Sequence, residues 1–592
     1  MHLVYLGTSG NQDYVFASNK LRENLGASDL TARATTWWVA EALRGLGGPD
    51  LLAAGTQKEV QGVLVDDWPT VRRRILDPKV NQHGGKYEVV YLSSGVSLVI
   101  AQNEDAAKEL IGQVSRRVLE KAPGLAFTGC FVEATMDNIH EKVKDLFEKE
   151  KPVSGNLPRA NRFMRLPFVA PCATNSLPAA RRDIRDGVTT PADPENADQY
   201  DRRSKVSLCK RKQREKFWHR IAALDGATED VASVVNIVTT EWLEEQFEHE
   251  EWLAVVHADG NGFGKIFTNF GLGVPKADYV PTIRQFSILL EECTERAFTK
   301  AVASLKADID EAPGVRMMVP LVLGGDDITV VVRASEALAF TETYLEEFLD
   351  ETKQADGRDA TYGFQEVLKM FGFKPQVGMG AAAGIAVVKP HFPFHTAYSL
   401  AEELCKRAKK QTKAVFQPPV LSIDFHTVFD AGYVKLSDIE SGQVVPGHGR
   451  LTAKPLVIGD PKATGARESA EWQHRTLEKF NAAVKALGAK NEDNRPLVPA
   501  TQTHALREAL FQGVAPAEAK LAQVKAQLGG NALKEVLAGG NVFFPAIEQG
   551  ENGPKQIHRT MFLDVLDWLH FADASDERQN EPEMLQEQEA QA

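Results

Sequence analysis

The hydrophobic pattern from about residue 250 onward alternates between short apolar runs and helical spacing. The predicted order is strand, helix, hairpin, helix, strand, helix. This order is typical of a ferredoxin-like α+β domain. The predicted elements are a strand at 252–259, a helix at 282–305, a hairpin around 321–332, a helix that follows Ser335, a strand at 376–388 and a helix at 396–413.

The first 150 residues repeat this order. A strand at 2–6 and a helix at 32–44 precede a hairpin at 87–100, and a helix at 105–122 and a strand at 125–133 follow it. Matched order on both sides of a hairpin favours an internal duplication. Ser93-Ser94-Gly95 stands at the tip of this first hairpin, so the first copy is expected to keep the fold without acidic residues.

The second hairpin carries the most informative chemistry, because Gly324-Gly325-Asp326-Asp327 forms its tip. The predicted strand before it ends in Asp259, and the glycine-rich turn Gly260-Asn261-Gly262-Phe263-Gly264 follows. Hard cations such as Mg²⁺ or Mn²⁺ take carboxylate oxygens as ligands. Glycine-rich turns also leave backbone N–H groups free to face phosphate. A plain surface turn and a helix-capping Asp259 are the structural alternatives.

These motifs resemble a known family. Together with the runs 14–28, 383–385 and 401–409, they are similar to the large polymerase/cyclase (palm-domain) subunit of type III CRISPR effector complexes, which is related to diguanylate-cyclase palms. The resemblance implies two ferredoxin-like palm domains, the first degenerate and the second catalytic. It also implies that ATP is joined into cyclic oligoadenylate.

The resemblance assigns roles to individual residues. Asp259, Asp326 and Asp327 are expected to be catalytic and to bind one or two Mg²⁺ or Mn²⁺ ions. The residues expected to contact the nucleotide are Gly260, Asn261, Gly262, Phe263, Gly264, Gly324, Gly325, Lys406 and Lys409. Asn261 replaces a residue that is commonly acidic in the family. The implied partners are ATP, other effector subunits, guide RNA and target RNA.

Charge, cysteine content and missing motifs narrow the expected partners, compartment and activities of the chain. The 592 residues carry a net charge of −13, which disfavours indiscriminate binding to nucleic acid. Five cysteines without regular pairing and no apolar run of membrane length predict a cytoplasmic protein with no membrane partner. The chain has no adjacent His-Asp pair, the hallmark of the nuclease domain in the family, so we expect a variant without the N-terminal nuclease domain or DNase activity.

The expected domain division has five parts. They are a degenerate first palm at 1–150, a linker with a degenerate zinc-ribbon-like and helical domain at 151–248, a catalytic second palm at 249–428, a C-terminal helical bundle at 429–572 and a disordered acidic tail at 573–592. Two other functions stay open. One is a free-standing cyclic mono- or dinucleotide synthase, perhaps homodimeric, and the other is a non-catalytic scaffold of an RNA–protein complex.

We predict that the purified chain contains no stoichiometric zinc. In the resembled family the insertion carries two Cys-x-x-Cys pairs, whereas here Asn175 and Lys212 follow Cys172 and Cys209 in the second places. A structural zinc site needs four ligands, usually thiolate or imidazole. Elemental analysis of the protein checks this, and one zinc per chain would contradict it.

Overall fold

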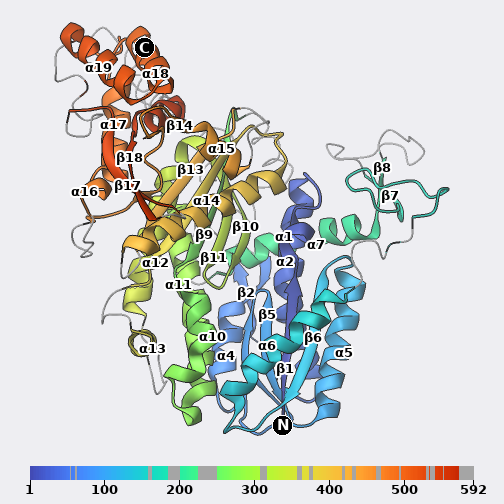
Figure 1. Cartoon of the computed structure of the whole chain (residues 1–592). Helices are drawn as coiled ribbons and strands as arrows, with labels where there is room; N and C mark the ends of the chain where they lie inside the picture. Colours follow the sequence, from blue (N-terminus) through green and yellow to red (C-terminus); the bar gives the residue numbers. More distant parts are fainter. Residues whose placement is uncertain are drawn as a thin grey trace, which may run out of the picture.

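Two β-sheets with covering helices form the body of the chain (Figure 1). The computed structural model describes residues 1–53, 55–60, 63–157, 163, 165–184, 200–224, 250–306, 316–355, 363–372, 378–416, 420–429, 435–461, 469–491, 495–528, 533, 540–550 and 553–571. The predicted disordered tail at 573–592 lies outside these residues. None of the described helices combines the length and the apolar composition that a membrane span requires.

The first unit comprises residues 2–155. Its four-stranded sheet has the order β4-β5-β1-β6, and a separate hairpin, β2–β3, stands beside it. The elements are β1 His2–Ser9, α1 Asn11–Val15, α2 Leu21–Thr35, α3 Trp37–Gly45, β2 Gln57–Val60, β3 Val63–Asp66, α4 Trp68–Leu76, β4 Tyr87–Ser93, β5 Val96–Ala101, α5 Glu104–Lys121, β6 Ala126–Glu133 and α6 Ile139–Gly155.

The second unit comprises residues 253–457. Its six-stranded sheet has the order β10-β11-β9-β12-β13-β16. The elements of this sheet and its helices are β9 Leu253–Gly260, α10 Phe263–Gly273, α11 Tyr279–Ala303, β10 Met318–Gly324, β11 Asp327–Arg333, α12 Ala337–Gln354, α13 Phe364–Met370, β12 Ala381–Val388, α14 Phe394–Val415, β13 Ser422–Thr427 and β16 Leu456–Val457.

The predicted repeat is present in the topology. The order β10-β11-β9-β12 reproduces β4-β5-β1-β6, with a hairpin at the edge and the first strand of each unit beside it. The strands form because their sequences are dense in β-branched residues, as in 328–332. The second sheet then adds β13, which is parallel to β12, and the short β16, so it is larger than the predicted domain.

The two units pack through their hairpins and the helices beside them. α2 of the first unit packs on β10, and α11 of the second unit packs on β4. The hairpin tips meet: a Cβ built on Gly324 would lie 2.7 Å from the Cβ of Ser94. Glycine at position 324 is therefore required by the close approach of the other hairpin.

Buried ion pairs cross the same boundary. The Arg72 guanidinium on α4 donates to Glu291 at 3.1 Å and to Glu295 at 2.9 Å, and all three side chains are buried. Nearby, Arg284 donates to Glu88 at 2.7 Å. Such pairs hold the units in one register, because breaking them would leave charges without water or partner.

The insertion between the units holds a two-stranded sheet, β7 Arg181–Ile184 and β8 Tyr200–Arg203, and the helix α7 Lys205–Ala222. α7 packs along α2 so closely that a Cβ on Gly26 would overlap the Lys210 carbonyl. Asn175, in the place of a zinc ligand, instead accepts a hydrogen bond from the Leu177 N–H at 3.2 Å.

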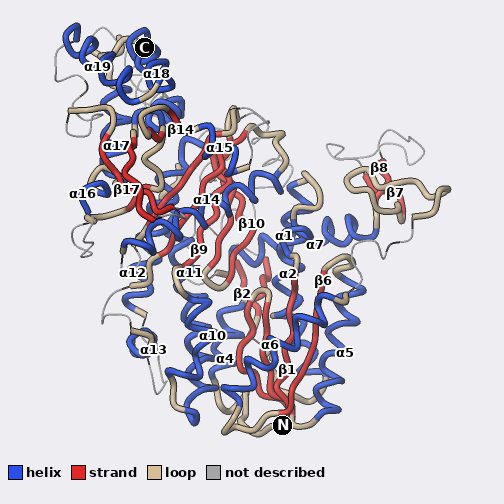
Figure 2. Tube along the Cα trace, viewed as in Figure 1, coloured by secondary structure: helices blue, strands red, loops and turns tan. Residues whose placement is uncertain are grey.

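The prediction of a purely helical C-terminal part was wrong. The expected helices are present, but a four-stranded sheet of order β14-β15-β18-β17 accompanies them (Figure 2). Its strands were missed because two are only two residues long and another contains charged and polar residues at most positions. The elements are α15 Leu436–Gly442, β14 Val444–Val445, β15 Gly449–Arg450, α16 Ser469–Trp472, α17 Leu477–Gly488, α18 Ala500–Gln512, α19 Val514–Leu528, β17 Phe544–Gly550, β18 Gly553–Arg559 and a last helix at 562–571.

Replacing Arg72 by leucine should lower the free energy of unfolding by roughly 3–5 kcal/mol, because Glu291 and Glu295 would stay buried without their cation. Chemical denaturation measures this. Arg73→Leu is the matched control, since Arg73 lies on the same helix but is exposed, and it should change stability by no more than about 0.5 kcal/mol. Equal effects of the two substitutions would contradict the assignment.

Candidate active site

The strand register brings the three predicted aspartates to one end of the second sheet. Asp327 on β11 lies directly opposite Asp259 on β9, and Gly324 lies opposite Asp327 across the hairpin. The Gly260 N–H donates to the Asp326 carbonyl at 3.1 Å, which ties the hairpin tip to the end of β9. Adjacent antiparallel strands thus place the carboxylates together, although Asp259 is 67 and 68 positions before Asp326 and Asp327 in the sequence.

The hairpin tip is hydrogen-bonded to α11, and glycines allow its conformation and its close approach to β9. The Thr294 hydroxyl donates to the Gly325 carbonyl at 2.6 Å. Gly325 has φ +64, a left-handed conformation that glycine adopts without strain. A Cβ on Gly260 would lie 3.0 Å from the Cβ of Asp326 and 2.6 Å from the Phe263 ring. Small residues at 260 and 325 therefore let the acidic tip approach β9.

Lys409 on α14 supplies a positive charge at this point. Its ammonium group forms an ion pair with the Asp259 carboxylate and donates to the Gly260 carbonyl at 2.9 Å. The other predicted lysine does not reach the carboxylates. Lys406 pairs with Glu402 one turn away at 2.9 Å, and its side chain is exposed.

The ionised forms of the other two carboxyl groups, Asp326 and Asp327, are disfavoured in this site. Burial, and next the Asp259 carboxylate, raise the pKa of Asp326 to about 7. The same causes, with Asp326 added, raise the pKa of Asp327 well above its ordinary value. Its Oδ1 oxygen is buried and has no hydrogen-bond partner among the described residues. Both groups therefore favour a proton or a cation.

The glycine-rich turn leaves fewer N–H groups free than its sequence suggests. The Gly260 N–H is used by Asp326, and the Asn261 N–H donates to the Gly380 carbonyl at 2.8 Å. Gly262 adopts φ +92 and begins α10. The N–H groups of Phe263 and Gly264 lie in the first turn of this helix, where no preceding carbonyl can satisfy them. The Phe263 side chain is buried, so its backbone alone could face a ligand.

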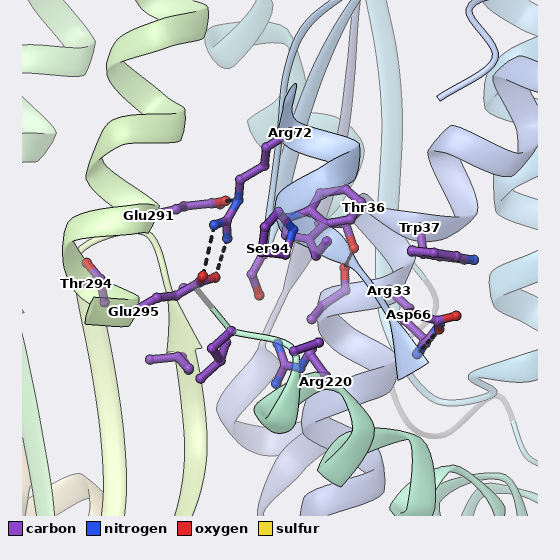
Figure 3. Close-up of a pocket in the computed structure, with 17 residues that line it drawn as sticks. Arg33, Thr36, Trp37, Asp66, Arg72, Ser94, Arg220, Glu291, Thr294 and Glu295 are labelled. Atoms are coloured by element: carbon purple, nitrogen blue, oxygen red, sulfur yellow. Dashed lines mark hydrogen bonds and ion pairs between the residues drawn. The ribbon is translucent and has the colours of Figure 1, made fainter. Parts of the chain in front are cut away.

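A cleft of about 170 Å³ opens from Asp327 between the units. Its walls come from α1, α2 and Ser94 of the first unit, from Arg220 on α7, and from Gly324, Asp327 and Tyr398 of the second unit. A smaller cavity of about 60 Å³ lies on the other side of the hairpin tips. Figure 3 shows it beside Ser94, with Arg72 reaching from α4 to Glu291 and Glu295.

The donor chemistry of the site fits a hard divalent cation. Carboxylate oxygens are the preferred ligands of Mg²⁺ and Mn²⁺, and the unpartnered Oδ1 of Asp327 marks a place where charge is unbalanced. Among the residues that the structure describes, no group of three or more His, Cys, Asp or Glu side chains is already arranged around a metal position. Lys409 acts as the counter-ion of Asp259 in this arrangement.

Several residues at the site were not singled out as site residues from the sequence. Gln12 on α1, Phe16 directly after α1, Thr294 on α11 and Tyr398 on α14 lie around the carboxylates or the groups that support them. Each is an ordinary polar or aromatic residue in a predicted helix or loop. Only the packing of the first unit on the second brings them together, so spacing along the chain could not identify them.

Comparison with known families gives one match. Residues 252–416 match the family described as Cas10/Cmr2, second palm domain. These residues contain the three aspartates, the glycine-rich turn and Lys409. No curated protein sequence matches the chain.

Solved structures with a similar arrangement include Csm1 from T. onnurineus, with 14% identity, a TM-score of 0.47, and coverage of 96% of this chain and 69% of that chain. A Csm1–Csm4 cassette in complex with pppApA gives 13% identity and a TM-score of 0.47 over 96% and 69% of the two chains. A Csm1–Csm4 cassette in complex with cA4 gives 11% identity and a TM-score of 0.43. That match covers 90% of this chain and 63% of the other chain. We draw no conclusion about the site from scores this low.

In the absence of divalent cations, Asp326→Asn should become progressively more stabilising relative to the wild type as the pH rises from about 4 to about 7. The folded-state pKa of Asp326 is raised from 3.8 to about 7, so its favourable contribution is fully present below pH 3.8 and is lost as the pH rises through 7. Asparagine cannot ionise and escapes this loss.

Melting temperatures measured between pH 4 and 8 in EDTA check this. Added Mg²⁺ should stabilise the wild type more at pH 8 than at pH 6, because the cation binds the ionised carboxylate. A constant difference between variant and wild type across this range would show that Asp326 is not the group that titrates.

Proposed function

We propose that this chain is a metal-dependent nucleotidyltransferase that joins ATP into cyclic oligoadenylate. The match of residues 252–416 to the family described as Cas10/Cmr2, second palm domain, supports this proposal. The 3′-hydroxyl of one nucleotide attacks the α-phosphate of the next, and pyrophosphate leaves. The protein works in the cytoplasm within a type III CRISPR effector complex, with guide RNA and target RNA held by the assembly.

One observation carries this proposal. Asp259, Asp326 and Asp327 lie at the same end of two paired strands, beside a glycine-rich turn that starts a helix. Carboxylates collected in this way are suited to cations that also bind phosphates. A scaffold would gain nothing from this arrangement, in which burial, and next the Asp259 carboxylate, raise the pKa of the other two groups.

Each residue has a distinct task in the proposed reaction. Asp259, Asp326 and Asp327 would hold the cations, whose chemistry would be to ease deprotonation of the 3′-hydroxyl and to stabilise charge on the α-phosphate. The N–H groups at the start of α10 would face a phosphate. Lys409 pairs with Asp259, and its ammonium group would be free to pair with the triphosphate once Asp259 binds a cation.

The first unit serves as the second wall of the nucleotide cleft. By strand register, Gly95 and Val96 of its hairpin stand in the places of Asp326 and Asp327, and Ser94 lies against Gly324. Neither glycine nor valine has a side-chain oxygen that could bind Mg²⁺. We therefore assign the chemistry to the second unit and a structural, nucleotide-contacting role to the first.

The direct test is to incubate the purified chain, alone and assembled with guide and target RNA, with each of the four NTPs and Mg²⁺ or Mn²⁺. Mass spectrometry of the products identifies the base and the ring size. Cyclic products made only in the RNA-bound complex support the proposal. Cyclic mono- or dinucleotides made by the chain alone would favour a free-standing synthase, and no product under any condition would favour a scaffold.

The double variant Asp326→Ala/Asp327→Ala should lower the rate of product formation at least about a thousandfold, or roughly 4 kcal/mol in the barrier, because the cation ligands are lost. Asp145→Ala/Glu148→Ala is the matched control, since it removes two exposed carboxylates from α6 and should leave the rate unchanged. Full synthesis by the first variant would remove this hairpin from the active site.

A further inference from the structure

His257 is a buried histidine beside the carboxylates that no proposed step uses. It lies on β9 two residues before Asp259, on the same face of the sheet, and directly opposite Thr329 on β11. Only 5% of the residue is exposed. Its Nδ1 atom is 3.1 Å from the Thr329 hydroxyl, and its Nε2 atom is 3.6 Å from Oδ1 of Asp327.

The His257 ring packs against the ring of Tyr398. The two rings meet edge to face with their centroids 5.4 Å apart. Tyr398 is itself fixed by the first unit, because Gln12 donates to its hydroxyl at 2.6 Å and Phe16 stacks on its ring at 4.9 Å. On the neighbouring strand β12, Gly384 lies opposite His257. The contacts of the imidazole with Tyr398 and Thr329 leave it little freedom to rotate.

These contacts select one tautomer. When the Thr329 hydroxyl donates to Nδ1, the proton of the neutral ring lies on Nε2 and faces the Asp327 carboxylate. The opposite tautomer would turn a lone pair of Nε2 toward Oδ1. A carboxylate oxygen repels a lone pair and attracts an N–H group, so the first arrangement is favoured.

Asp327 presents two different oxygens to its surroundings. Oδ1 is buried and without a hydrogen-bond partner among the described residues, whereas the side chain as a whole is 42% exposed. Its accessible surface must therefore lie mainly on the other atoms, including Oδ2. The 3.6 Å between Nε2 and Oδ1 is too long for a hydrogen bond, but a movement of well under 1 Å would close it to the usual length.

We propose that His257 is a positioning residue for Asp327: its Nε2–H holds the inner oxygen Oδ1 and so directs the outer oxygen toward the cation. Thr329 fixes the tautomer, and Tyr398 fixes the ring and links it to the first unit. This inference rests on the proposed function only in taking Asp327 as a cation ligand. Residues that orient a ligating carboxylate typically contribute 10–100-fold to metal affinity.

The test measures Mn²⁺ binding to the full-length protein by calorimetry, with nucleotide synthesis measured in parallel. His257→Leu should weaken Mn²⁺ binding about tenfold and lower kcat while the KM for ATP changes less than threefold. His257→Gln keeps an amide N–H within reach of the same oxygen and should restore most of the affinity. Thr329→Val should weaken Mn²⁺ binding less than His257→Leu does. It removes the hydroxyl that selects the tautomer of His257 but leaves the imidazole in place.

His426→Leu is the matched control, since His426 is also a strand histidine of the second sheet, partly buried on β13. It should bind Mn²⁺ like the wild type. Melting temperatures in EDTA show whether each variant is folded. Unchanged Mn²⁺ affinity in His257→Leu overturns the inference, as does a His257→Gln variant that is as stable as the wild type but binds no better than His257→Leu.

Binding separates this inference from the proposed function. If the wild type binds Mn²⁺ through the aspartates but makes no nucleotide product, the proposed function fails, and the affinities of the variants still decide the role of His257. If Asp326→Ala/Asp327→Ala binds Mn²⁺ as tightly as the wild type, Asp327 is not a ligand and the inference fails.

Discussion

The crowding of negative charge at the ends of β9 and β11 is the constraint on which the rest of this structure depends. Three partly exposed carboxyl groups lie together there, and one lysine is paired with Asp259. Neighbouring like charges disfavour the ionised form of each other, and a cation removes that penalty. The neighbouring features allow the arrangement to exist: Gly260 admits the hairpin tip, Thr294 holds the turn, and Lys409 neutralises Asp259.

The first unit matters because the second cannot complete the site alone. The two sheets share a strand order, and their hairpin tips meet at Ser94 and Gly324. The buried ion pairs of Arg72 fix this contact, while α1 reaches across to Tyr398. A displacement of one unit would therefore shift Tyr398 and His257, and through them the Asp327 carboxylate.

The sequence was a good guide where local pattern and chemistry coincide. Period and turn residues predicted the main strands and hairpins of both units, their shared order, and the meeting of Asp259 with the acidic hairpin, because antiparallel pairing follows from the topology. The helix predicted at 32–44 was wrong, because the chain there ends α2 at Thr35 and begins α3 at Trp37. The sequence failed where the outcome depends on tertiary packing. The sheet in the C-terminal part has very short or polar strands. The role of Tyr398 needs α1 and α14 side by side, and Lys409 differs from Lys406 only in the face of α14 on which it lies.

The most direct test of this account is a crystal structure of the full-length protein with Mn²⁺ and a non-hydrolysable ATP analogue, with the anomalous signal of the metal measured. The account predicts an Mn²⁺ peak at roughly 2.0–2.3 Å from carboxylate oxygens of Asp259 and of the Asp326-Asp327 tip. It also predicts that the Lys409 ammonium leaves Asp259 for the phosphates. A structure in which the nucleotide is bound elsewhere, Lys409 stays on Asp259 and no anomalous peak lies at the hairpin would contradict it.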